Sequence, residues 1–212
     1  MCFLIYFVLH KIFVKIEIRG RENLKGLKKP VIFASNHTSE LDVTITPLML
    51  GLFSRFYPLY YVSDPKDKFK SFGWRNYIYG GIFFNILGGY PIHSGFHDYE
   101  ISLVTFIELL EDGQSVFIFP EGKRTADGKL GKARGGLGFM VYEMEVPVVP
   151  VAINTFYDIS WKKYFTRSRK VIVTILPPIF PDKLIKTDTP TVEDYRHATK
   201  EILKRIDKEL AK

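Results

Sequence analysis

A histidine and an aspartate are spaced for joint chemistry in residues 36–42, directly after an apolar run that ends at Ser35. A neutral imidazole removes a proton from a hydroxyl group best when its second ring nitrogen is held. Asp42 lies five residues beyond His37, around a turn, and can accept that hydrogen bond and stabilise the imidazolium. The pair therefore predicts that His37 is a general base, with Asn36 beside it. The structural alternative is that His37 caps a turn and Asp42 begins a helix.

A second polar group follows another apolar run, residues 115–119, and comprises Pro120, Glu121, Gly122, Lys123, Arg124 and Thr125. The proline and glycine favour an irregular turn, and a carboxylate so close to a core needs a partner. Lys132 and Arg134 add two cations before Gly135 and Gly136, where we expect a helix to start. Cations and free helix N–H groups both suit a phosphate. The alternative is a solvated basic loop.

The elements that position these groups can be predicted from hydrophobic periodicity. Residues 31–35, 115–119, 146–153 and 171–175 are nearly continuous apolar runs, as in strands covered on both faces, and residues 15–20 alternate as a half-exposed strand. Apolar residues recur at helical spacing over 101–110 and 191–212. This alternation predicts a single α/β domain with a mostly parallel or mixed central sheet flanked by helices. Both polar groups would then lie at strand ends, where open α/β sheets bind ligands.

The amino terminus is apolar over residues 1–9, until His10 and Lys11 interrupt it. A membrane-spanning helix needs roughly 20 apolar residues, so this run is too short to cross a bilayer by itself. We expect residues 1–14 to form a short helix and residues 15–212 to form the main domain. The helix either lies in a membrane interface or docks on the core.

Composition narrows the class of protein. Of 212 residues, 46% are hydrophobic and 25% charged, which fits a globular domain. One cysteine permits no internal disulfide, the histidines follow no metal-ligand spacing, and no secretory signal is recognisable, so we expect no metal and a cytoplasmic setting. A net charge of +7 indicates a polyanionic partner. The aromatic residues of 53–84 lie among apolar residues, which favours a lipid interface over nucleic acid, and residues 161–170 mix aromatics with cations.

Three segments, in the same order along the chain, resemble the signature of the glycerolipid acyltransferase family. That signature comprises an Asn-His-x-x-x-x-Asp block, a Phe-Pro-Glu-Gly-x-Arg-Ser/Thr block and a Val-Pro-x-x-Pro-Val strand, here residues 36–42, 119–125 and 146–151. The resemblance implies that His37 deprotonates an acceptor hydroxyl, which attacks the thioester of acyl-CoA or an acyl-carrier protein, while Asp42 orients the base. Direct transfer needs no further cofactor. In the family's pattern Glu121, Gly122 and Arg124 bind the acceptor's glycerol and phosphate, and Pro147 and Pro150 shape the site.

One position departs from the family pattern. Where an arginine is expected after the segment Gly88-Gly-Tyr-Pro91, this chain has Ser94. Either Lys132 or Arg134 replaces it, so that the acceptor is 1-acyl-sn-glycerol 3-phosphate, or the acceptor is another lysolipid or a hydroxylated lipid. The alternative to an enzyme is a non-catalytic protein that binds a lipid interface. In each case we expect a peripheral or monotopic protein on the cytoplasmic face of a membrane.

Overall fold

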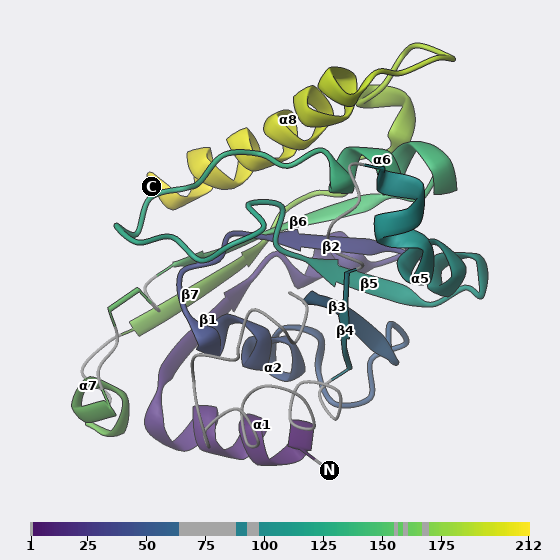
Figure 1. The fold of residues 1–212 in the computed structure, drawn as a ribbon. Helices are drawn as coiled ribbons and strands as arrows, with labels where there is room; N and C mark the ends of the chain where they lie inside the picture. The colour runs from purple at the N-terminus through teal and green to yellow at the C-terminus, as the bar shows by residue number, and fades with distance from the viewer. Residues whose placement is uncertain (1, 64–87, 93–97, 155–156, 159–160, 167–169) are drawn as a thin grey trace.

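The computed structural model describes residues 2–63, 88–92, 98–154, 157–158, 161–166 and 170–212 (Figure 1). Within them, a sheet of seven strands has the order β1-β7-β6-β2-β5-β3-β4. The strands are β1 (Lys15–Arg19), β2 (Ile32–Ser35), β3 (Leu59–Ser63), β4 (Gly89–Pro91), β5 (Ser115–Ile118), β6 (Val148–Asn154) and β7 (Lys170–Ile175). Neighbouring strands are parallel except β6 and β7, which are antiparallel. The predicted α/β fold with a mixed sheet is confirmed.

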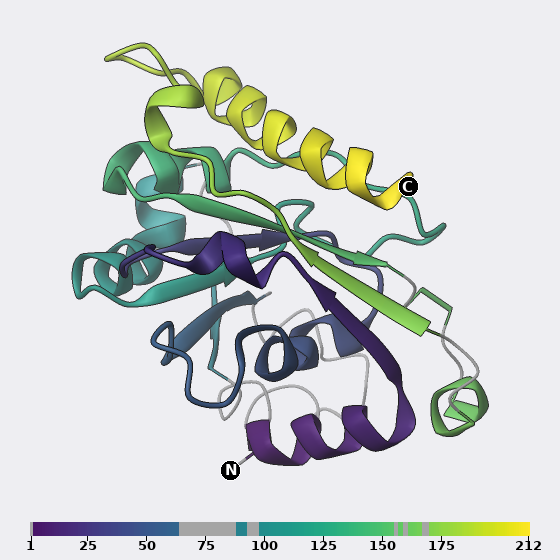
Figure 2. The ribbon, with the colours of Figure 1, turned by 180° about the vertical axis from the view of Figure 1, so that it is seen from behind.

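Helices cover both faces of this sheet (Figures 1 and 2). One face carries α5 (Tyr99–Glu111), α6 (Gly136–Met144) and α8 (Val192–Leu210), and the other carries α1 (Cys2–Phe13) and α2 (Thr46–Leu50). In the described part of the chain, the remaining elements are α7 (Trp161–Phe165) and the 3-10 helices Arg21–Leu24, Glu40–Ile45 and Pro181–Lys183. The sheet is therefore the middle of three layers.

The central strand β2 has no solvent-facing side. Phe33 points into the core under α1 and α2, whereas Ile32 and Ala34 point into the core under α5, α6 and α8. This two-sided burial explains the continuous apolar run, because both faces of the pleat must be apolar. Ile32 pairs with Val116 of β5 and with Val148 of β6, so the carboxyl ends of these three parallel strands meet at one edge of the sheet.

Helix α1 is docked along one side and exposed along the other. Phe7 and Phe13 pack against the core, and buried His10 has its Nε2 atom 2.6 Å from Thr44 Oγ1. Burial lowers the pKa of His10 to about 4. Leu4, Val8 and Ile12 lie four residues apart and are about half exposed. Docking on the core, one of the two expectations for this helix, is thus observed.

The structure also contains two short strands that the sequence pattern did not predict, β3 and β4. Helix α6 begins at Gly136, where the sequence predicted a helix start. Among the described residues, none of the helices has both the length and the hydropathy needed to cross a bilayer. The aromatic stretch predicted at 53–84 is described only up to residue 63, since residues 64–87 lie outside the described part.

The packing of α6 on α8 gives a test of the fold. A Cβ atom at Gly138 would lie 2.2 Å from the Tyr195 carbonyl oxygen, a backbone atom, whereas at Gly136 it would meet the flexible Leu103 side chain at 3.2 Å. We expect Gly138→Ala to lower the free energy of unfolding by about 2 to 3 kcal/mol, because the two helices must separate. Gly136→Ala should change it by less than about 1 kcal/mol. Equal urea-unfolding midpoints for the two variants would contradict this packing.

Candidate active site

His37 and Asp42 meet in the turn after β2. Asp42 is fully buried, and its Oδ2 atom accepts hydrogen bonds from His37 Nδ1 at 3.0 Å and from the backbone N–H groups of Thr38 at 2.6 Å and Ser39 at 2.8 Å. Three donors on one oxygen hold the Asp42 side chain in place. With Nδ1–H directed at Asp42, the lone pair of the neutral imidazole lies on Nε2. The His37 side chain is 18% exposed, and this arrangement is suited to taking a proton from a substrate hydroxyl.

The imidazole is also held from the side by an aromatic ring. The ring of Phe119, at the end of β5, stacks on the His37 ring with 3.9 Å between centroids and 15° between planes. Phe119 is 9% exposed and packs in turn edge-on against Phe117. The ring plane of His37 is therefore set by the core of the sheet.

Glu121 connects the turn after β5 to the backbone of His37. Its Oε1 atom accepts the His37 N–H at 2.7 Å, and its Oε2 atom accepts the Gly131 N–H at 2.5 Å. The residue is only 2% exposed, and burial raises the pKa of its carboxyl group. Both oxygens thus bind protein backbone, which meets the need for a partner predicted from the sequence. An acceptor-binding role for Glu121 remains a prediction, and the contacts present support a positioning role.

Two further contacts bind the same segments together. The Thr125 N–H donates to the His37 carbonyl at 2.9 Å, and the Arg134 N–H donates to the Pro120 carbonyl at 2.9 Å. The Asn36 side chain exchanges two hydrogen bonds with the Ile153 backbone, at 2.8 and 2.9 Å, and so continues the pairing of β2 with β6. The segment that carries His37 is consequently bound on both sides by neighbouring strand ends.

The prolines of the third block lie at different distances from this turn. Pro150 pairs with Ala34, near the carboxyl end of β2. Pro147 accepts a hydrogen bond from Ile32, at the amino end of the same strand. The structure therefore brings Pro150 towards His37 but leaves Pro147 at the far end of β2, because each residue of a strand advances the chain by about 3.3 Å.

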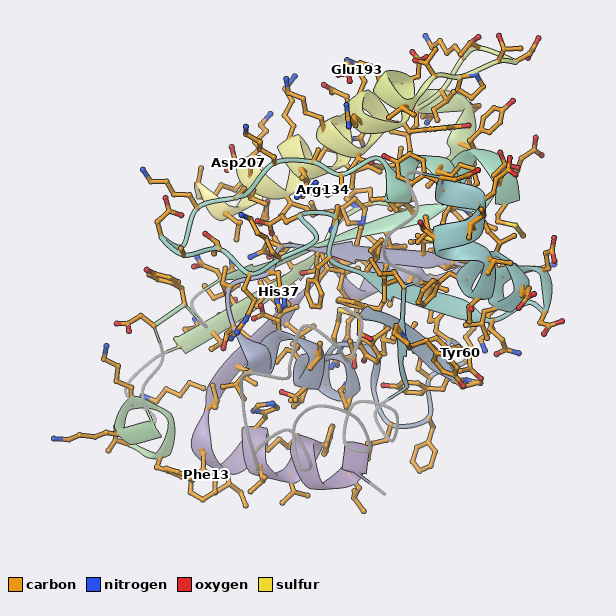
Figure 3. All side chains as sticks on the ribbon, viewed as in Figure 1. Phe13, His37, Tyr60, Arg134, Glu193 and Asp207 are labelled. Atoms are coloured by element: carbon orange, nitrogen blue, oxygen red, sulfur yellow. The ribbon has the colours of Figure 1, made fainter. Side chains whose placement is uncertain are left out.

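The basic residues of the site lie on the surface around Gly122. Lys123, Arg124, Lys132 and Arg134 are all exposed. Gly122 has φ +70°, and a Cβ atom there would lie 3.3 Å from Arg134 Cγ, so the Arg134 side chain lies against this turn. In the view of Figure 3, Arg134 lies between His37 and helix α8. The Thr125 hydroxyl donates to Asp127 at 2.8 Å. Ser94 lies outside the described residues.

Sequence reasoning missed two contributors to this arrangement. The sequence motif contains Phe119 as its first residue but does not predict that its ring stacks on His37. Nothing in the sequence marks Gly131 as the partner of Glu121, since ten residues separate them. A Cβ atom at Gly131 would approach Glu121 Oε2 to 2.8 Å, so a glycine is needed there. Among the described residues, no group of three His, Cys, Asp or Glu side chains is placed to hold a metal ion.

The three-layer α/β fold thus joins the His37–Asp42 pair to the turn after β5, which carries exposed cations, and this cationic turn and the pair form an arrangement suited to proton removal beside an anion. Residues 15–154 match the sequence model of the family described as Acyltransferase. This match covers more than half of the chain, which therefore belongs to the acyltransferase family.

Curated relatives carry related names. The chain is 32% identical over 142 residues to the chloroplastic 1-acyl-sn-glycerol-3-phosphate acyltransferase BAT2 of Brassica napus, covering 66% of this chain and 38% of that protein. It is 26% identical over 196 residues to 1-acyl-sn-glycerol-3-phosphate acyltransferase alpha of Mus musculus, and the alignment covers 91% of this chain and 65% of that protein. The chain thus spans less than two thirds of the length of these relatives.

A solved structure shares the fold. The 1-acyl-sn-glycerophosphate (LPA) acyltransferase of Thermotoga maritima aligns with a TM-score of 0.63 over 97% of this chain and 80% of that one. At 22% sequence identity, this similarity establishes the common architecture of the two chains.

The contact between Glu121 and Gly131 can be tested without touching the base. We expect Gly131→Ala to displace the carboxylate that holds His37 and to lower kcat for acyl transfer roughly tenfold to a hundredfold, because small misplacements of a base are costly. The KM for the acceptor should change less than about threefold. Steady-state kinetics with Gly136→Ala as the control measures this effect. An unchanged kcat would contradict the positioning role of Glu121.

Proposed function

We propose that the protein transfers a fatty acyl group from a thioester donor, acyl-CoA or an acyl-carrier protein, to the free hydroxyl of 1-acyl-sn-glycerol 3-phosphate. The observation that carries this proposal is the hydrogen bond between His37 Nδ1 and Asp42 Oδ2, in a turn joined through Glu121 to the cationic turn. The names of the relatives support the same acceptor. The product would be phosphatidate, a precursor for phospholipid synthesis.

The proposed reaction is a direct transfer with His37 as the base. Its Nε2 atom takes the proton of the acceptor hydroxyl while the hydroxyl oxygen attacks the thioester carbonyl carbon. A carbon–oxygen bond forms, the carbon–sulfur bond breaks, and the leaving thiolate receives the proton from the imidazolium to give a free thiol. Asp42 stabilises the imidazolium between these two steps. No covalent acyl-enzyme is needed.

The cationic turn is suited to the phosphate of the acceptor. The Arg134 side chain lies against Gly122, the residue after Glu121, and Arg124 follows two residues later in the same turn. A guanidinium group can bind two phosphate oxygens in parallel, which fixes the orientation of the glycerol as well as its charge. Lys123 and Lys132 extend the positive field around this turn. We propose that Arg134 compensates for the arginine absent at Ser94.

Replacing the base tests the catalytic proposal. We expect His37→Ala to lower kcat by roughly a hundredfold to ten-thousandfold while the fold persists, because a partly exposed base contributes little packing. Free thiol release from a long-chain acyl-CoA, in the presence of 1-acyl-sn-glycerol 3-phosphate, measures the rate. If His37→Ala kept more than a tenth of wild-type turnover, His37 would not be the base. If the wild type released no thiol with any lysolipid, the non-catalytic alternative would be favoured.

The identity of the acceptor is tested by changing the charge of residues 134 and 94. If Arg134 binds the phosphate, Arg134→Ala should raise the KM for 1-acyl-sn-glycerol 3-phosphate about tenfold or more, with little change for lysophosphatidylcholine, because a charge-assisted hydrogen bond is lost. Ser94 favours the second candidate, an acceptor with less negative charge. In that case the wild type would acylate lysophosphatidylcholine at least as well, and Ser94→Arg would shift its preference to the phosphate monoester.

Membrane contact is proposed for the end of the molecule that carries α1 and α7. The half-exposed side chains of Leu4, Val8 and Ile12 form an apolar stripe, and Phe165 of α7, also about half exposed, packs edge-on against Phe13 at 4.9 Å. An apolar stripe together with basic residues supplies the two contributions that stable peripheral binding requires. We propose a peripheral or monotopic location on a cytoplasmic membrane face.

Negative charge placed in that apolar stripe should release the protein from the membrane surface. We expect the double substitution Val8→Glu and Ile12→Glu to weaken binding to anionic vesicles about tenfold or more, because two apolar side chains no longer enter the interface. The matched control is Ile101→Glu, a half-exposed aliphatic residue on α5. Co-sedimentation with vesicles measures the bound fraction. Equal binding by the double variant and the wild type would exclude α1 as the contact.

A further inference from the structure

A fully buried imidazole lies on the docked side of helix α1. His10 is shielded from solvent, and its lowered pKa of about 4 keeps the ring neutral near neutral pH. The half-exposed stripe lies on the opposite side of the helix, because His10 follows Val8 by two residues, about 200° around the axis. Neither the proposed acyl transfer nor the proposed membrane contact uses this ring. Burying a polar ring costs free energy, so the contact that it makes points to its role.

His10 bonds to the 3-10 helix that carries Asp42. Its Nε2 atom lies 2.6 Å from the Oγ1 atom of Thr44, a residue that is also buried. The Thr44 hydroxyl donates its single hydrogen to the Leu41 carbonyl at 2.7 Å. The hydroxyl oxygen therefore accepts, and the His10 Nε2–H group donates. This bond fixes both the tautomer and the orientation of the buried ring.

The 3-10 helix Glu40–Ile45 connects this contact to His37. Asp42 and Thr44 are two residues apart on it, about 4 Å along its axis. Internal hydrogen bonds of 3-10 helices have poor geometry, so contacts with the rest of the molecule decide where such a short helix lies. A shift of this helix would move the Asp42 Oδ2 atom relative to the three donors that it binds, one of which is His37 Nδ1.

Apolar packing joins the same two elements. Phe7 of α1 and Leu41 of the 3-10 helix pack against one core cluster, in which Ile45 is fully buried. Figures 1 and 2 both show α1 and α2 on the same side of the sheet. Apolar contact is non-directional, whereas a hydrogen bond fixes the direction from donor to acceptor. The bond from His10 to Thr44 thus adds a directional contact between α1 and this helix.

We propose that His10 is a positioning residue: through Thr44 it holds the 3-10 helix that carries Asp42. Helix α1 thereby sets the orientation of the His37 base. This inference rests on the proposed function and adds a residue to its site. His10 acts through Thr44 and Asp42 and needs no contact with a substrate. Helix α1 then has two separable roles, because the stripe proposed to meet lipid and the ring that holds the turn lie on opposite sides of it.

The experiment removes the hydrogen bond and then restores it. His10→Leu deletes the donor, and we expect kcat for acyl transfer to fall roughly fivefold to fiftyfold, with the acceptor KM within about twofold of the wild type. His10→Gln should recover about half or more of the wild-type kcat, because its amide N–H can reach the same acceptor. Binding of His10→Leu to anionic vesicles should equal that of the wild type. Steady-state thiol release gives both kinetic constants.

The matched control makes one substitution at two buried threonines. Thr44→Val removes the acceptor of the His10 bond and should lower kcat as His10→Leu does. Thr199→Val in α8 also removes a buried hydroxyl, which accepts the Gly138 N–H and donates to the Tyr195 carbonyl. This control should leave kcat within about twofold of the wild type. Urea-unfolding midpoints measure any loss of stability in each variant.

A second measurement needs no turnover. The Thr38 and Ser39 N–H groups donate to Asp42, so their hydrogen–deuterium exchange, followed by NMR, should be about fivefold faster or more in His10→Leu. Exchange of the Gly131 N–H, which is bonded on the β5 side of the site, should be unchanged. A local shift of the 3-10 helix is thereby separated from a general loss of stability.

Each other result counts against the proposal. An unchanged kcat in His10→Leu, or a fall that His10→Gln does not recover, would show that the hydrogen bond does not position the base. Equal losses in Thr44→Val and Thr199→Val would show a general effect on the fold, and weaker vesicle binding by His10→Leu would show an effect on membrane attachment. If the wild type transfers no acyl group, the proposed function fails and the exchange rates decide this inference. Equal rates at Thr38 and Ser39 in the wild type and His10→Leu would then overturn it.

Discussion

The buried carboxylate of Glu121 is the contact on which the arrangement of this site depends. A carboxylate in a nearly closed environment must find hydrogen-bond donors, and the donors here are the backbone N–H groups of His37 and Gly131. These two bonds join the turn after β2, the turn after β5 and the loop that precedes α6. His37 and the exposed cations of residues 122–134 are thereby held in one frame.

That frame exists because β2 lies between two parallel neighbours. The carboxyl ends of β5, β2 and β6 meet at one sheet edge, which places residue 37 beside residue 121 and the Asn36 side chain beside the Ile153 backbone. The imidazole is further restricted by Asp42 and by the ring of Phe119. Such pre-organisation reduces the freedom that a general base would otherwise lose on reaching the transition state.

The surfaces on either side of the site differ in chemistry. α1 presents an apolar stripe at one end, and the loop before α6 presents cations at the other. In the proposed reaction between a membrane lipid and a water-soluble thioester, the position of His37 between these two surfaces would let each substrate approach from its own phase.

The sequence by itself determined the strands β1, β2, β5, β6 and β7, the helices α1, α5 and α8, the start of α6, and the pairing of His37 with Asp42. Each of these depends on local periodicity, on local turn chemistry or on a separation of five residues. Only the tertiary structure decided the antiparallel pairing of β6 with β7, the distance of Pro147 from the site and the partners of Glu121. Contacts such as that between residues 37 and 121 join segments 84 residues apart, and no local pattern specifies which backbone N–H a buried carboxylate will meet. Strand order settles that choice, since it sets which ends share an edge of the sheet.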